Sequence, residues 1–187
     1  TVHELEVLEK AGKLLEHLPL YIDYKACNTL SDIRSKVMLK SKKGECDFVI
    51  LDYLHLLSSI RQKNETQEQV VGRNITALKQ LALDADCPVL VVSQVNRASD
   101  QRVDKAHIPV MSDLRDSGTI EQVADCVVFV YRPEKHGITK DERTGESLVG
   151  VGKLYIVKNR NGATGIARFR YNPSYTKITD YRNTATS

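Results

Sequence analysis

The chain has 187 residues, of which 41% are hydrophobic, and this composition suits one globular domain with a sizeable core. Its 27 basic and 24 acidic residues give a net charge of only +3, which is too small to indicate a polyanion partner from bulk charge alone. No segment approaches the roughly 18 apolar residues of a membrane span. The composition therefore excludes fibrous, disordered and membrane classes and predicts a soluble cytoplasmic protein.

The cysteines and histidines give no indication of a metal site. Neither the five histidines nor the four cysteines show zinc-ligand spacing, and there is no C-x-x-C pair. Cys87 and Cys126 border apolar runs typical of buried strands, which predicts reduced core thiols rather than disulfides. We therefore expect no structural metal.

The first quarter of the chain is predicted to hold two helices. Leucines recur near the helical period over residues 3–18, and a short strand is expected from Leu20 to Asp23. A second helix is expected to run to about Lys40, with Thr29 or Ser31 as its cap. A polar, glycine-containing turn follows it.

Two apolar runs and the helix between them predict a parallel sheet. The runs at residues 47–52 and 88–94 show no alternation, which fits strands covered on both faces by helices. The helix between them is expected to bury Val70, Ile75 and Leu78 on one face. This order predicts a three-layer α/β/α domain with a mainly parallel central sheet.

The second half of the chain alternates polar segments with strands. The polar segment from Val95 to Ser117 is long for a loop in a compact domain, and such loops are usually functional. A short helix then leads to a strand at Val127–Tyr131, which is followed by a polar excursion from Glu134 to Glu146. Residues 153–158 and 166–171 predict a C-terminal β-hairpin with a turn rich in Asn and Gly.

Polar side chains follow both apolar runs. Asp52 ends the first run and Gln94 ends the second, and open α/β sheets bind ligands outside the carboxyl ends of their strands. A carboxylate there can hold Mg²⁺ through water, and a neutral amide can both donate to a γ-phosphate oxygen and accept from water. From the residues alone, an aspartate that starts a turn and a glutamine that leaves a strand are alternatives.

Two cations stand near the turn of the predicted hairpin. Lys158 and Arg160 are two residues apart, so strand periodicity points both to one face. Together they can clamp a phosphate, and the arginine can act across a subunit boundary as a finger. A solvated basic turn is the alternative, and spacing alone favours it.

The segment from Ser93 to Arg132 resembles the corresponding stretch of DnaB-type replicative helicases at its motif positions. It reads SQVNRASDQRVDKAHIPVMSDLRDSGTIEQVADCVVFVYR. The segment FVILDYLHLL, residues 48–57, is similar to the family's Walker B strand, and KNRNGATGIARFRYN, residues 158–172, to its arginine-finger hairpin and the strand after it. One departure is His55, where family members commonly carry Gln.

The resemblance implies a RecA-like fold and an ATP-dependent helicase that unwinds DNA at the replication fork. It assigns Asp52 to magnesium, Gln94 to γ-phosphate sensing, and Lys158 with Arg160 to the nucleotide of a neighbouring subunit. It implies ATP and Mg²⁺ as cofactors. The implied partners are single-stranded DNA, further copies in a homohexameric ring, a primase and a helicase loader.

The resemblance also places Arg115, Asp116 and Gly118 on a loop that faces the DNA channel. Glycine lets backbone N–H groups approach a phosphate, and the arginine supplies charge. The same D-S-G sequence can cap the helix after it. Arg132 and Tyr171 resemble the pair that sandwiches the adenine in related ring helicases, although a tyrosine near a strand end is more often a packing residue.

The phosphate-binding motif G-x-x-x-x-G-K-[ST] is absent from the sequence. The two Gly-Lys pairs, which begin at Gly12 and Gly152, are both followed by leucine. We interpret residues 1–187 as a partial motor domain whose N-terminal portion is missing, and we expect it to be inactive for ATP hydrolysis. A RecA- or RadA-type recombinase is disfavoured by the S-D-L-R-D-S-G segment, and a nucleotide-independent scaffold by the retained site residues.

Overall fold

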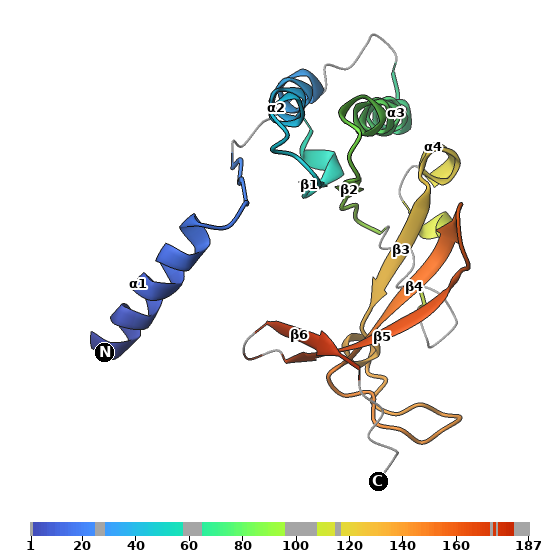
Figure 1. The fold of residues 1–187 in the computed structure, drawn as a ribbon. Helices are drawn as coiled ribbons and strands as arrows, with labels where there is room; N and C mark the ends of the chain where they lie inside the picture. The colour runs from blue at the N-terminus through green and yellow to red at the C-terminus, as the bar shows by residue number, and fades with distance from the viewer. Residues whose placement is uncertain are drawn as a thin grey trace.

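A computed structural model describes residues 2–24, 29–57, 65–95, 108–114, 117–172, 174 and 176–181. Its helices are α1 (Val2–Glu16), α2 (Leu30–Lys42), α3 (Gln67–Ala85) and α4 (Ser117–Val123), with short 3-10 turns that include η3 (Met111–Asp113) and η4 (Pro133–His136). Its strands are β1 (Val49–Leu51), β2 (Val89–Val91), β3 (Cys126–Tyr131), β4 (Val151–Asn159), β5 (Gly165–Asn172) and β6 (Lys177–Asp180). Helices α2, α3 and α4 lie along one side of β1, β2 and β3, while α1 extends away from them (Figure 1).

Reciprocal capping fixes where α2 and α3 begin. The side chain of Thr29 accepts from the N–H of Asp32 at 3.1 Å, and the Asp32 carboxylate accepts from the N–H of Thr29 at 3.1 Å. Thr66 and Gln69 form the same pair at the start of α3, at 3.2 and 2.8 Å. Each pair satisfies two backbone donors that would otherwise lack partners. Of the two predicted caps, Thr29 and Ser31, the structure shows Thr29.

The core lies between α3 and the strands. Val71, Leu78 and Leu81 of α3 are only 2–3% exposed. They pack in one apolar cluster with residues from α2, α4, β3 and the connecting segments, including Val37, Leu54, Leu114, Ile120, Val127 and Phe129. Burial of each such aliphatic side chain stabilises the fold by about 1.5–3 kcal/mol. The predicted apolar face of this helix is therefore confirmed.

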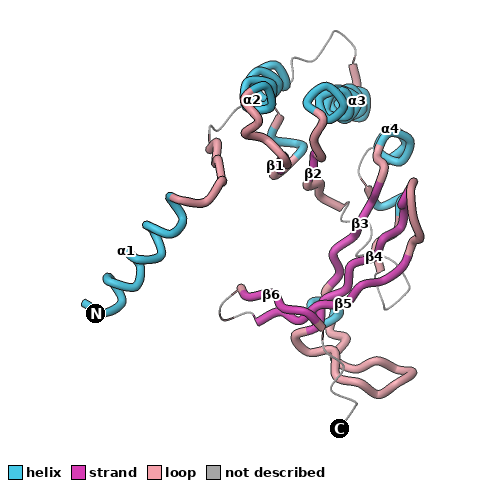
Figure 2. Tube along the Cα trace, viewed as in Figure 1, coloured by secondary structure: helices cyan, strands magenta, loops and turns pink. Residues whose placement is uncertain are grey.

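The strands form a parallel pair and a separate antiparallel sheet. β1 and β2 are parallel, with Val49 opposite Val89, whereas β3, β4, β5 and β6 are antiparallel in that order. The α/β class and the C-terminal hairpin are confirmed. The expectation of a mainly parallel sheet holds only for β1 and β2, because the chain returns by hairpins from β3 onward and hairpins give antiparallel pairing. The excursion between β3 and β4 contains η4 but is otherwise mostly loop (Figure 2).

Only one face of the strands is covered in the part of the chain that the structure describes. Residues alternate between exposed and buried along β3, where Val128 and Val130 are 43% and 67% exposed. Ile50 of β1 and Leu90 of β2 are 62% and 50% exposed. The described residues therefore supply two of the three expected layers. An uninterrupted apolar run shows that both faces of a strand are apolar, but it does not show which residues cover them.

Two local expectations at the N-terminal end have different outcomes. The helix predicted at residues 3–18 is confirmed as α1, which has no buried residue. The strand predicted at Leu20–Asp23 is wrong, because this exposed segment pairs with no other described strand. None of the described helices is both long and apolar enough to cross a membrane.

The cysteines differ in burial. Cys87 is buried, and this burial raises the pKa of its thiol, as expected for a core residue. Cys126 is exposed, so the core prediction is wrong for it, because alternate residues of a strand point to opposite faces. The described cysteines form no disulfide, and Cys27 lies outside the described residues.

Gly152 provides a test of the β4 and β5 packing. It lies opposite Phe169, and a Cβ atom at Gly152 would lie 2.0 Å from the Cζ atom of that ring. Gly152→Ala should therefore lower the free energy of unfolding by about 1–3 kcal/mol, measured by chemical denaturation. Gly165→Ala is the matched control, since a Cβ at this position meets no atom within 4 Å. Equal losses in the two variants would show that Phe169 does not require a glycine opposite it.

Candidate functional site

Asp52 and Gln94 lie at the same end of two adjacent strands. Asp52 directly follows β1, and Gln94 lies three residues beyond the end of its parallel neighbour β2. The N–H of Val92 donates to the carbonyl of Leu51 at 2.9 Å, which continues the pairing past the strand ends. Both Asp52 and Gln94 are exposed. Their predicted placement at one carboxyl edge is confirmed, and their chemical roles are still predictions.

The donor set at this edge fits a hydrated magnesium ion. Among the described residues, no group of three or more His, Cys, Asp or Glu side chains could hold a metal ion. Magnesium commonly keeps several waters and binds through one or two carboxylates together with phosphate oxygens, so the single carboxylate of Asp52 is sufficient. His55, three residues later, lies near Tyr53, with ring centres 6.2 Å apart, and both of its ring nitrogens are buried without a hydrogen-bond partner among the described residues.

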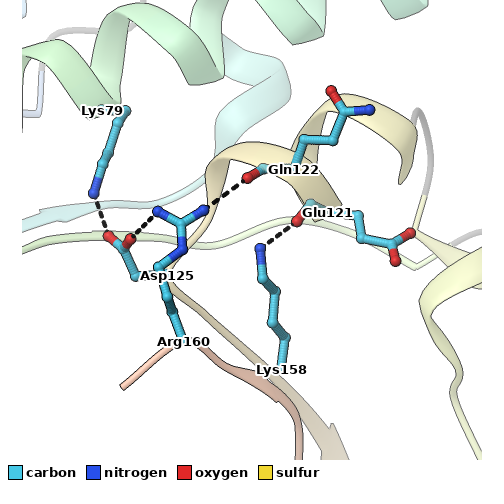
Figure 3. Close-up of polar contacts among 6 residues, drawn as sticks. All are labelled: Lys79, Glu121, Gln122, Asp125, Lys158 and Arg160. Carbon is cyan, nitrogen blue, oxygen red and sulfur yellow. Dashed lines mark hydrogen bonds and ion pairs between the residues drawn. The ribbon is translucent and has the colours of Figure 1, made fainter. Parts of the chain in front are cut away.

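Lys158 and Arg160 both reach the C-terminal end of α4 (Figure 3). The Lys158 ammonium donates to the carbonyl of Glu121. The Arg160 guanidinium donates from Nη1 to the Asp125 carboxylate at 2.9 Å and from Nη2 to the carbonyl of Gln122 at 3.0 Å. The prediction that the two cations share a face is confirmed. Their specific partners disfavour the alternative of a simple solvated turn.

Asp125 is a site residue that sequence reasoning did not identify. Its carboxylate accepts from Lys79 of α3 as well as from Arg160, and its carbonyl accepts from the Arg160 N–H at 2.8 Å. The hydrogen bond from Lys79 lowers the pKa of the Asp125 carboxyl, and the charge of Arg160 lowers it further. The sequence did offer one indication. Asp125 is an acidic residue between α4 and β3, and β3 pairs with β4, the strand that carries Lys158.

Of the three predicted DNA contacts, only Gly118 is described. It is exposed in the first turn of α4, whereas Arg115 and Asp116 lie outside the described residues. Gly118 and Lys158 line one surface cavity of about 560 Å³, together with Met111, Glu121, Gln122 and Val157. The structure therefore brings a predicted DNA residue and a predicted nucleotide residue to the same cavity.

Arg132 and Tyr171 lie together but leave no space for a base. The guanidinium carbon of Arg132 is 3.7 Å from the centre of the Tyr171 ring, whereas a base between them needs about 7 Å, which is two contact distances. The Tyr171 hydroxyl donates to the Glu134 carboxylate, which also accepts from the N–H of Gly150 at 3.0 Å. The two residues are neighbours, the space between them is closed in this conformation, and their role in adenine binding is still a prediction.

Comparison with known proteins gives a consistent family match. Residues 1–180 match the DnaB-like helicase C-terminal domain. The chain is 39% identical to the replicative DNA helicase DnaB of Leifsonia xyli subsp. xyli over 163 residues, which is 87% of this chain and 34% of the relative. It is 33% identical to a probable replicative DNA helicase of Trieres chinensis over 175 residues, 93% of this chain and 37% of the relative. The chain thus spans about a third of the length of these relatives.

Solved structures agree with the sequence matches. The fold is similar to a DnaB-like replicative helicase described with its interactions with primase, and to a separately solved ATPase domain. Each comparison has a TM-score of 0.72 and 29% identity over 84% of this chain, and covers 36% and 53% of the respective structures. These neighbours confirm the expected RecA-like α/β fold class.

The contacts of Glu134 predict a pH-dependent contribution to stability. The Tyr171 hydroxyl and the Gly150 N–H lower the pKa of the Glu134 carboxyl. A lowered folded-state pKa stabilises the fold above the unfolded-state value of about 4.3 and loses this contribution as the pH falls through the folded-state value.

Glu134→Gln should therefore be less stable than the unchanged protein near neutral pH, and the difference should shrink below about pH 4. Urea denaturation between pH 3 and 7 measures it. Glu142→Gln, an exposed change in the same excursion, is the control. If the difference in unfolding free energy between Glu134→Gln and the unchanged protein stays constant from pH 3 to 7, the Glu134 carboxyl does not have a lowered pKa in the folded protein.

Proposed function

This chain belongs to the DnaB-like helicase C-terminal domain family, and we propose that it forms part of the motor domain of an ATP-dependent replicative DNA helicase. The full-length protein assembles as a homohexameric ring, translocates on single-stranded DNA in the cytoplasm and unwinds duplex DNA at the replication fork. The observation that supports an ATP-driven function most directly is the placement of Asp52 and Gln94 at the shared carboxyl edge of β1 and β2.

At this edge the two side chains serve the phosphate end of one nucleotide in different ways. Asp52 would hold a magnesium ion through water, and that ion would supply positive charge to the nucleotide's phosphates. Gln94 donates from its amide to a γ-phosphate oxygen and accepts from water through its carbonyl. Because these hydrogen bonds change when the γ-phosphate leaves, Gln94 reports the state of the nucleotide to the segment that follows β2.

Lys158 and Arg160 act on the nucleotide of a neighbouring subunit. Their side-chain hydrogen bonds in the described part of the chain go to α4 and Asp125, and none goes to Asp52 or Gln94. The hairpin turn lies beside the first residue of β3, Cys126, which pairs with Asn159. An arginine supplied in trans stabilises charge on the transferring phosphoryl group and can increase the rate by roughly 10³ or more.

The proposed DNA contacts are Arg115 and Asp116, which precede α4 in the sequence, and Gly118, which lies in its first turn. Arg115 supplies charge to the phosphate backbone, and Gly118 lets backbone N–H groups approach it. Asp116 acts through its backbone or by orienting Arg115. A primase and a helicase loader are the proposed protein partners, and the solved relative described with its interactions with primase supports the first of these.

The 187-residue chain by itself should show no magnesium-dependent ATP hydrolysis, because its sequence contains no phosphate-binding loop. Phosphate release by the purified chain should equal that of its Asp52→Ala variant. Turnover clearly above this control would contradict the expectation that the 187-residue chain is inactive by itself.

In the full-length protein, Arg160→Ala should abolish most of the ATPase activity, by roughly 10³ in kcat, while nucleotide affinity changes only a few-fold. This variant is then mixed with a second variant that lacks its own phosphate-loop lysine. In mixed rings, some interfaces pair an intact phosphate loop with an intact arginine, so steady-state ATPase activity should partly return. If mixed rings form and no activity returns, the assignment in trans is wrong.

A further inference from the structure

We propose that Asp125 is a positioning residue that holds Arg160 in the orientation in which it reaches the neighbouring subunit's nucleotide. This inference rests on the proposed function, because it gives a role to a residue whose target is that nucleotide. Asp125 itself touches neither nucleotide nor DNA in this proposal. It acts only through the side chain and backbone of Arg160.

Arg160 is restrained at three points. Its N–H donates to the Asp125 carbonyl at 2.8 Å, Nη1 to the Asp125 carboxylate at 2.9 Å, and Nη2 to the carbonyl of Gln122 at 3.0 Å. A guanidinium has five N–H donors, so these two side-chain bonds leave three for a further ligand. The side chain is also 49% exposed. Arg160 is therefore oriented and still accessible to a phosphate from outside the subunit.

The carboxylate that orients Arg160 is itself held by the core helix. Asp125 accepts from Arg160 through Oδ1 and from Lys79 through Oδ2, so the two cations share one carboxylate (Figure 3). Lys79 belongs to α3, whose buried side chains include Leu78 at 3% exposure. The hairpin turn is thereby fixed to the most buried helix, and a fixed donor loses little freedom when it binds phosphate.

The C-terminal end of α4 adds a second restraint on the hairpin cations, because its carbonyl oxygens are also negatively polarised. The carbonyls of Glu121 and Gln122 lie in its last turn and accept from Lys158 and Arg160. Carbonyls at a helix C-terminus lack helical partners and carry partial negative charge, so cations there are stabilised. Both hairpin cations thus share one platform, which consists of the C-terminal turn of α4 and Asp125.

The test is a double-mutant cycle in the full-length protein, with DNA-stimulated ATPase activity, ring assembly and thermal unfolding as readouts. Asp125→Asn keeps the size of the side chain and removes its charge. It should lower kcat at least 10-fold and leave the KM for ATP within about twofold, because misplacement of a catalytic group by about 1 Å can cost 10² in rate. Asp125→Asn combined with Arg160→Ala should be no slower than Arg160→Ala alone.

Asp84→Asn is the matched control, because it removes an exposed α3 carboxylate that pairs with Arg34 at 2.7 Å. Its kcat should stay within about twofold of the unchanged protein. Lys79→Met is a second route if Asp125→Asn fails to assemble. Lys79→Met removes the cation that holds the Asp125 carboxylate. It should lower kcat less than Asp125→Asn does, and it should cause no further loss when it is combined with Arg160→Ala.

The possible outcomes separate this inference from the function on which it rests. If Arg160→Ala is inactive and Asp125→Asn has normal kcat, the inference is wrong and the proposed function stands. A loss in Asp125→Asn that multiplies with that of Arg160→Ala, or that follows lower thermal stability or failed ring assembly, assigns Asp125 a purely structural role and overturns the inference. Normal ATPase activity in Arg160→Ala would overturn both this inference and the proposed action of Arg160 in trans.

Discussion

The packing of α3 against the strands is the interaction on which both parts of the candidate site depend. Its buried residues close the core above β1, β2 and β3, and this closure holds the carboxyl ends that carry Asp52 and Gln94. The same helix approaches α4 so closely that a Cβ at Gly72 would lie 2.9 Å from the Thr119 hydroxyl oxygen. Through Lys79, α3 also anchors Asp125. The packing of α3 and the ion pair of its Lys79 thus together connect the nucleotide edge to the hairpin cations.

Features governed by local rules could be predicted from the sequence. Side chains that can cap a helix indicated that α2 begins near Thr29 or Ser31, and the capping box with Asp32 shows that Thr29 is the cap. Apolar residues at helical spacing gave α3, and two apolar runs separated by a helix gave the parallel pair that brings Asp52 and Gln94 together. Strand periodicity alone placed Lys158 and Arg160 on one face. In each case the controlling contacts are close in sequence or follow from a fixed backbone period.

Features that depend on distant partners could not be predicted. Leu20–Asp23 has strand composition, but a strand exists only where another strand pairs with it, and none of the described strands does. The apolar residues on the second face of β1, β2 and β3 are exposed for the same kind of reason, since no described residues cover them. The match to 53% of a solved ATPase domain is consistent with this, because that domain contains much chain beyond the matched part. Asp125 was missed because its two cationic partners lie 46 and 35 residues away.

If a nucleobase binds between Arg132 and Tyr171, as the family resemblance implies, the contact between these two side chains limits its selectivity. A base that enters between them has to replace an interaction already made, with the guanidinium 3.7 Å from the ring centre. A cation over an aromatic ring is worth about 0.5–2 kcal/mol, and a base stacked on an aromatic side chain about 1–3 kcal/mol. The base would gain a contact with each side chain and lose the contact between them, and every base offers a similar flat face. Such a pair distinguishes weakly between purines and pyrimidines, so most of the affinity for a nucleoside triphosphate would come from its phosphates.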